Sequence, residues 1–307
     1  MRYRIFDGHA DTMTKLYENK GSIRKNDYHI DFERIKIFEG YTQVFAAFVD
    51  QKAIKDPMKT YVKNVIEKYK DEIESCGISP VKTIDELKNE QYSSILSIEG
   101  GEAIEGDVDN LFEFYELGVR LMTLTWNYKN EICDGIGEKD GNGLTPFGKR
   151  VIKEMNKLGM VVDVSHISEK GFWDVLKASE KPFVASHSNV KSICNHPRNL
   201  TDAQIKAVIE NGGVIGINFY PMFLEDSGKC DLKKILEHIE YILYLGGENN
   251  IGLGSDFDGI EYLPDGMTGV ESVSKLISLM EEREYGKELI NKILFDNFFR
   301  VLEAVFA

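Results

Sequence analysis

Histidine and carboxylate residues follow directly after several short apolar runs of this 307-residue sequence. Imidazole nitrogens and carboxylate oxygens are ligands that zinc and similar divalent cations take in proteins. A carboxylate has two oxygens, so Glu99 can bridge two such ions. Divalent ions would relieve the repulsion between the carboxylates and lower the pKa of bound water toward ~7. The pattern therefore predicts a site for two metal ions, formed among His9, Asp11, Glu99, His166, His187 and Asp256.

The apolar runs that precede these residues read as buried strands. They are rich in β-branched and aromatic residues and do not alternate strictly with polar ones, which is typical of strands covered on both faces of a parallel sheet. Eight such runs alternate with helical patterns, so the sequence predicts a (β/α)8 barrel of the TIM type, formed as one catalytic domain over residues 1–307. The runs cover residues 3–8, 43–49, 93–98, 119–125, 160–165, 182–186, 213–219 and 250–255.

In a barrel of this kind, the ends of all the strands meet at one mouth, where the chemistry of such enzymes takes place. Seven of the eight runs end next to the six residues named above or next to Trp126, Asn127 and Tyr220. A single histidine after a strand is more often structural than functional. The inference rests on three histidines and three carboxylates that converge on the same mouth.

Helix boundaries between the runs carry recognisable signals. Thr83-x-x-Glu86 and Thr201-x-x-Gln204 predict capping boxes. Thr145-Pro146 predicts a helix start, and Gly159 predicts the end of that helix. Asp231 predicts the start of a helix that ends near Gly246.

Composition narrows the class of protein. The formal charge is −14, from 37 basic and 51 acidic residues, which disfavours a nucleic-acid partner. Hydrophobic residues make up 42% of the chain, yet no apolar run approaches the ~18–20 residues that span a bilayer, so we expect no membrane partner. The four cysteines lie far apart, which disfavours a disulfide framework and predicts a cytoplasmic protein.

The motifs that hold these residues resemble the renal (membrane) dipeptidase family of zinc dipeptidases, within the metal-dependent amidohydrolase superfamily. The similarity runs in order through nearly the whole chain. The matching motifs include Asp7-Gly8-His9-x-Asp11, Ile98-Glu99-Gly100-Gly101, Asp163-Val164-Ser165-His166, Ala185-Ser186-His187-Ser188, His196-Pro197-Arg198-Asn199 and Gly252-x-Gly254-Ser255-Asp256-Phe257-Asp258-Gly259.

The resemblance implies a role for each residue. His9, Asp11 and Glu99 would hold one zinc ion, and Glu99, His166 and His187 would hold a second, with Glu99 as the bridge. A hydroxide between the two ions would attack the amide, with Asp256 as the proton shuttle. Arg198 would bind the substrate's carboxylate, and Tyr220 and Asn218 would line the pocket. The implied substrates are dipeptides, including those with a C-terminal D-residue, and the resemblance alone implies a homodimer.

One position departs from the family pattern. After Thr123-Leu124-Thr125, the mammalian members carry a histidine that helps to hold the substrate, whereas this chain has Trp126 followed by Asn127. An indole N–H donates one hydrogen bond but accepts no proton. We expect Trp126 and Asn127 to contact the substrate and to alter its selection.

Two alternatives stay open at this point. The first is an amidohydrolase-like enzyme that acts on another small amide, a lactam or an ester. The second is a barrel that binds metal without catalysis, which the presence of every expected ligand, Asp256 and Arg198 disfavours. Among residues outside the set, His29 and His238 are expected at the surface, and His196 and Asp258 are candidates to orient ligands.

Overall fold

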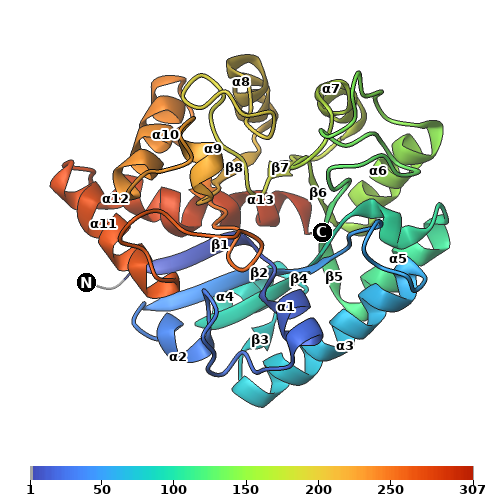
Figure 1. Ribbon diagram of the computed structural model, residues 1–307, viewed down its shortest axis with the longest axis horizontal. Helices are drawn as coiled ribbons and strands as arrows, with labels where there is room; N and C mark the ends of the chain where they lie inside the picture. Colours follow the sequence, from blue (N-terminus) through green and yellow to red (C-terminus); the bar gives the residue numbers. More distant parts are fainter. Residues whose placement is uncertain (1–2, 307) are drawn as a thin grey trace.

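A computed structural model describes residues 3–306 and shows a closed barrel of eight parallel strands with helices around it (Figure 1). Each strand pairs with the next in sequence, β2 pairs directly with β4, and β9 returns to β1. The barrel strands are β1 (Arg4–Ala10), β2 (Gly40–Phe48), β4 (Tyr92–Glu99), β5 (Val119–Thr123), β6 (Val161–Asp163), β7 (Val184–Ala185), β8 (Val214–Ile217) and β9 (Ile251–Leu253). The predicted (β/α)8 barrel and all eight predicted runs are therefore confirmed.

A ninth strand, β3 (Ser79–Pro80), pairs with the beginning of β4 outside the ring. Its two residues offer no periodicity, and the sequence does not predict it.

Helices surround the barrel, and Figure 1 shows α3, α5, α6, α7, α8, α10 and α11 distributed around the strands. The α-helices are α1 (Thr12–Asn19), α2 (Phe32–Ile35), α3 (Met58–Cys76), α4 (Ile84–Asn89), α5 (Val108–Leu117), α6 (Pro146–Leu158), α7 (Glu169–Ala178), α8 (Asp202–Asn211), α9 (Pro221–Leu224), α10 (Leu232–Tyr244), α11 (Val273–Glu282), α12 (Lys287–Asn291) and α13 (Asn297–Val305). Short 3₁₀ turns cover η1 (Gly101–Ile104) and η2 (Val270–Ser272), and a π-helical segment, η3 (Lys292–Asp296), leads into α13.

The predicted helix caps and helix ends are present in the structure. Both capping boxes form, at Thr83 with Glu86 and at Thr201 with Gln204. The Thr145 side chain caps α6, which ends at Gly159 in the left-handed conformation. Helix α10 begins after Asp231 and ends at Tyr244.

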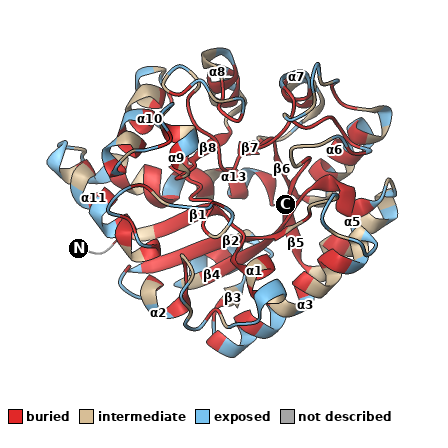
Figure 2. Ribbon diagram, viewed as in Figure 1, coloured by how far each residue is buried: buried red, intermediate tan, exposed pale blue. Residues whose placement is uncertain are grey.

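The strands are buried on both faces, and the exposed residues lie mainly on the outer sides of the helices (Figure 2). Seven strands each contribute one side chain to a shared core inside the barrel, and β9 contributes Gly252 instead. Phe298 of α13 fills that space, because a side chain at Gly252 would collide with its ring. Phe298 stacks on Phe6 at 4.7 Å between ring centroids, so α13 closes the barrel below the mouth.

Within residues 3–306, no helix combines the length and the apolar character needed to cross a membrane.

Candidate active site

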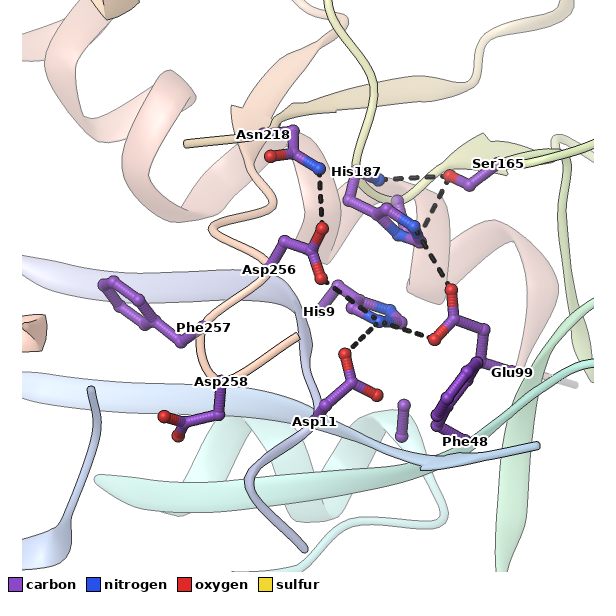
Figure 3. Close-up of polar contacts among 12 residues, drawn as sticks. His9, Asp11, Phe48, Glu99, Ser165, His187, Asn218, Asp256, Phe257 and Asp258 are labelled. Atoms are coloured by element: carbon purple, nitrogen blue, oxygen red, sulfur yellow. Dashed lines mark hydrogen bonds and ion pairs between the residues drawn. The ribbon is translucent and has the colours of Figure 1, made fainter. Parts of the chain in front are cut away.

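Glu99 stands at the centre of the site, as the last residue of β4 (Figure 3). Its Oε2 atom lies 3.3 Å from Nε2 of His9. Its Oε1 atom lies 3.0 Å from Nε2 of His166 and 3.4 Å from Nε2 of His187. Oδ2 of Asp11 lies 3.4 Å from the same Nε2 of His9. The structure thus brings the five predicted metal ligands together, and the two oxygens of Glu99 face two different groups of ligands.

Unusual backbone conformations direct three of the site side chains. The pairing of β1 with β2 shifts register between Asp7 and Ala10, so the bulge at this point includes His9 together with Gly8. His166 and Asp256 adopt positive φ angles of 66° and 61°, a region that non-glycine residues seldom occupy. Such conformations cluster at functional sites, where the surrounding structure holds them in place.

Asp163, at the end of β6, fixes the orientation of His187. Its carboxylate accepts hydrogen bonds from the hydroxyls of Thr123 and Ser186, each at 2.6 Å, and from the backbone N–H groups of Ser165 and Ser186. Because the Ser186 hydroxyl gives its proton to Asp163, it accepts from Nδ1 of His187 at 2.8 Å. The proton of the His187 ring therefore sits on Nδ1, and the lone pair of Nε2 points toward Glu99.

Asn127 performs the same task for His166. Its Oδ1 lies 2.8 Å from Nδ1 of His166, so the ring donates there and leaves Nε2 free. Asn127 also lines the cavity that opens above the cluster, called the main cavity, and its contact with substrate stays a prediction. Its hydrogen bond to a metal ligand is a feature that the sequence does not indicate.

The electrostatics of the cluster fit divalent cations. Burial, together with the neighbouring Glu99, raises the pKa of Asp11 to about 8, because two buried carboxylates repel each other. Burial lowers the pKa of His166 to about 4, so this ring is neutral and can coordinate a metal ion. Nε2 of His9, Oδ1 of Asp11 and Nε2 of His187 are buried and make no hydrogen bond within residues 3–306. Two groups of potential ligand atoms lie close enough to share an ion, His9–Glu99–His187 and His9–Asp11–Asp256.

Asp256 follows β9 and faces the same cluster, with Oδ1 3.9 Å from Nε2 of His9. Asn218 donates to the other oxygen, Oδ2, at 2.8 Å. Burial raises the pKa of Asp256. Asn218 is buried and does not line the main cavity, so its contact in this structure is with Asp256 and not with the space for a substrate.

The main cavity has a volume of about 460 Å³ and opens directly above the cluster. Asp11, Glu99, His166 and Asp256 form its inner end, while aromatic residues form much of its walls. The predicted pocket residues Trp126 and Tyr220 both line it. Trp126 packs edge-to-face against Phe48, with ring centroids 5.1 Å apart.

Arg198 lies beside the cluster but outside the main cavity. It lines a smaller cavity that it shares with His166 and Ser188. Its guanidinium is buried and donates from Nη2 to the backbone oxygen of His187 at 3.3 Å, while Nε has no hydrogen-bond partner among the described residues. Burial lowers the pKa of Arg198 to about 10, and the charges of Asp256 and Glu99 oppose that shift.

His238 contradicts the expectation of a surface position. It is fully buried, accepts a hydrogen bond from the Val190 N–H at 3.0 Å, and lies 3.0 Å from the Leu224 carbonyl through Nε2. It therefore joins α10 to the segment after β7 and to α9.

His29 is half-buried, and its Nδ1 accepts a hydrogen bond from the N–H of Asp258. The carboxylate of Asp258 in turn accepts a hydrogen bond from the hydroxyl of Thr12. Asp258 thus holds the segment after β9 against α1.

Three comparisons place the chain among known proteins. The sequence profile of the membrane dipeptidase family (peptidase family M19) matches residues 1–307. A Klebsiella pneumoniae protein, described as uncharacterised and encoded in the pqqA 5′ region, is 40% identical over 221 residues, which are 69% of this chain and 81% of that protein.

Two crystal structures match almost the entire fold. Dipeptidase AC, described as a metallopeptidase of the same family, has a TM-score of 0.91 and 29% identity, covering 100% of this chain and 99% of the other. A metallopeptidase from Rhodobacter sphaeroides, liganded with a phosphinate mimic of the dipeptide L-Ala-D-Ala, has a TM-score of 0.90 and 28% identity, covering 99% and 100%. The match over the full length of the sequence agrees with the barrel and its cluster of ligands, and the chain belongs to the membrane dipeptidase family.

Proposed function

We propose that this protein is a zinc-dependent dipeptidase that hydrolyses dipeptides, including those with a C-terminal D-residue. The observation that carries the proposal is the position of Glu99, whose two oxygens face His9 on one side and His166 with His187 on the other. Family membership supports the reaction class. The dipeptide mimic bound to the Rhodobacter sphaeroides relative supports the substrate class.

His9, Asp11 and Glu99 would hold one zinc ion, and Glu99, His166 and His187 would hold the other. When bound, the ions supply an activated water and polarise the peptide carbonyl. The chain's own contribution is to fix the ligands before metal arrives. Ser186 and Asn127 do this by holding the Nδ1 protons of His187 and His166.

Asp256 would take the proton from the attacking water and pass it to the leaving amine. One of its oxygens is fixed by Asn218, which turns the other toward the metal ligands. Its raised pKa moves its proton affinity closer to neutral pH, which suits a group that must both accept and release a proton.

Arg198 would bind the C-terminal carboxylate of the substrate. The buried Nε–H of Arg198 has no hydrogen-bond partner among the described residues, so it can donate to a substrate. The planar guanidinium group also matches the two oxygens of a carboxylate. Arg198 shares its small cavity with His166, which also lines the main cavity, so the substrate carboxylate would reach Arg198 on the His166 side of the site.

The direct test is the release of free amino acids from a panel of L,L- and L,D-dipeptides, together with forms blocked at the amino or carboxyl end. We expect cleavage of unblocked dipeptides, loss of cleavage when a chelator removes the metal, and no cleavage of carboxyl-blocked forms. Failure of metal-loaded protein to cleave any dipeptide would refute the proposal and would favour another small amide, a lactam or an ester as substrate.

A further inference from the structure

We infer that the outer part of the main cavity selects dipeptides that carry a cationic side chain, such as those of lysine or arginine. The inference rests on the proposed function, because it concerns the substrate class of the same site. It depends on two carboxylates at the outer part of the cavity and on the aromatic walls beside them, none of which is a predicted metal ligand.

The outer carboxylates belong to Glu18 at the end of α1 and to Glu261 after β9, and both residues are exposed and line the cavity. Within residues 3–306, neither forms an ion pair with a lysine or an arginine. Lys15 is the one lysine or arginine that lines this cavity in the described chain, and its Nζ lies 3.5 Å from Oδ1 of Asp258. One oxygen of Glu18, Oε1, accepts a hydrogen bond from the hydroxyl of Tyr61 at 2.7 Å. The negative charges of Glu18 and Glu261 therefore lie at the cavity without a cationic partner among the described residues.

Aromatic rings line the same cavity as these carboxylates. Tyr220 and Phe223 line the cavity and pack edge-to-face with their centroids 5.0 Å apart. Burial and the neighbouring Glu261 raise the pKa of Tyr220, so the phenol keeps its proton. Phe48 and Trp126 form a second aromatic pair on the wall. Aromatic faces next to a carboxylate form the environment that favours ammonium and guanidinium groups.

The predicted metal site lies at the inner end of this cavity, where Asp11, Glu99, His166 and Asp256 line it. His9 and Asp11 each present a buried polar atom that has no hydrogen-bond partner among the described residues, as the metal site requires. Cations bound there would balance the inner carboxylates Asp11, Glu99 and Asp256 but lie away from the outer pair. The outer mouth then stays negative, in a chain whose formal charge is −14. Such a field attracts cationic substrates and repels anionic ones.

The test compares kcat/KM of the metal-loaded protein on matched dipeptides. Lysine, its neutral isostere norleucine, and glutamate are each placed before alanine and, in a second series, after alanine. In at least one series we expect the lysine peptide to exceed the norleucine peptide by about fivefold, as exposed charge pairs and cation–π contacts allow, and the glutamate peptide to fall below both. Raising the ionic strength should reduce these ratios, because salt screens exposed charges.

Glu18→Gln and Glu261→Gln should each lower the ratio of lysine to norleucine by about twofold while the rate on the norleucine peptide stays nearly constant. Glu210→Gln is the matched control, since Glu210 is exposed on α8, does not line the cavity, and loses the same charge. Equal kcat/KM for lysine, norleucine and glutamate peptides in both series would overturn this inference and leave the dipeptidase proposal intact. Absence of cleavage of every peptide would overturn both.

Discussion

The hydroxyl of Ser186 lies between Oδ2 of Asp163 at 2.6 Å and Nδ1 of His187 at 2.8 Å. A hydroxyl carries a single proton, and Ser186 donates it to Oδ2 of Asp163, so the serine must accept from the histidine. The chain Asp163–Ser186–His187 therefore presents the Nε2 lone pair of His187 to the metal site. Hydrogen-bond partners of a metal ligand, such as Ser186, tune the affinity of the site for its metal ion.

Replacing Ser186 tests this relationship. Ser186→Ala removes the acceptor of the His187 Nδ1–H and leaves the ring free to take the other tautomer. We expect zinc affinity to fall by about 10- to 100-fold, measured by competition with a chromophoric chelator. Ser192→Ala is the control, because Ser192 is exposed and, among the described residues, its hydroxyl bonds only to Asp202. Equal zinc affinity in the two variants would show that Ser186 does not set the tautomer.

Arg198→Ala should raise KM and lower kcat/KM for free dipeptides by roughly 10²–10³-fold, as the loss of a buried charged contact would. Arg198→Lys keeps the charge but loses the planar fork, so it should restore part of the loss. Turnover of dipeptides by Arg198→Ala at the wild-type kcat/KM would refute the role of Arg198 in binding the carboxylate.

Asp256→Asn removes the proton acceptor while it keeps the side-chain shape. We expect kcat to fall by about 10²–10⁴-fold, with bound zinc close to the wild-type amount. Metal analysis and kinetics on the same preparation separate the two effects. If kcat fell only in proportion to lost zinc, Asp256 would be acting as a ligand and not as a proton shuttle.

From the burial of His238 we predict that the folded protein loses stability at acidic pH. Burial lowers the pKa of His238 to about 4, whereas a histidine in the unfolded chain has a pKa near about 6.5. Between these values the unfolded state binds the proton and the folded state does not, so stability falls as the pH drops from about 6.5 to about 4. The contribution from this one group is at most about 3 kcal/mol.

His238→Asn removes the titrating group and keeps one donor and one acceptor. We expect its free energy of unfolding in urea to decline less between pH 6.5 and pH 4 than that of the wild type. The two proteins should differ little in their pH dependence above neutral pH, where the histidine is neutral in both states. If the free energies of unfolding of the two proteins fell in parallel between pH 6.5 and pH 4, His238 would not be the group that causes the loss of stability.

The sequence alone predicts the barrel and the metal ligands because both depend on local order along the chain. Each buried strand reads as an apolar run, and parallel strands place the residues that follow them at one mouth. That is why His9, Glu99 and His166 could be placed together. Capping boxes such as Thr83 with Glu86 were equally predictable, because their geometry is confined to one helical turn.

Other features depend on contacts between distant segments. The positive φ angles of His166 and Asp256 and the bulge at His9 arise where strand ends meet neighbouring segments, and no residue type signals them. His238 lies beside the apolar face of α10 in sequence, but α9 and the segment after β7 cover that side of the helix. The motif Asp163-Val164-Ser165-His166 is visible in the sequence, yet only the structure shows that Asp163 acts on His187 through Ser186.

The measurement that most directly tests the account is the zinc dependence of hydrolysis, with the metal-free protein reconstituted by increasing equivalents of zinc. If Glu99 bridges two ions, dipeptide hydrolysis should reach its maximum only near two equivalents per chain, and Glu99→Gln should bind less than two and lose most activity. Full activity at one equivalent, or two tightly bound equivalents in Glu99→Gln, would contradict the bridged two-metal centre.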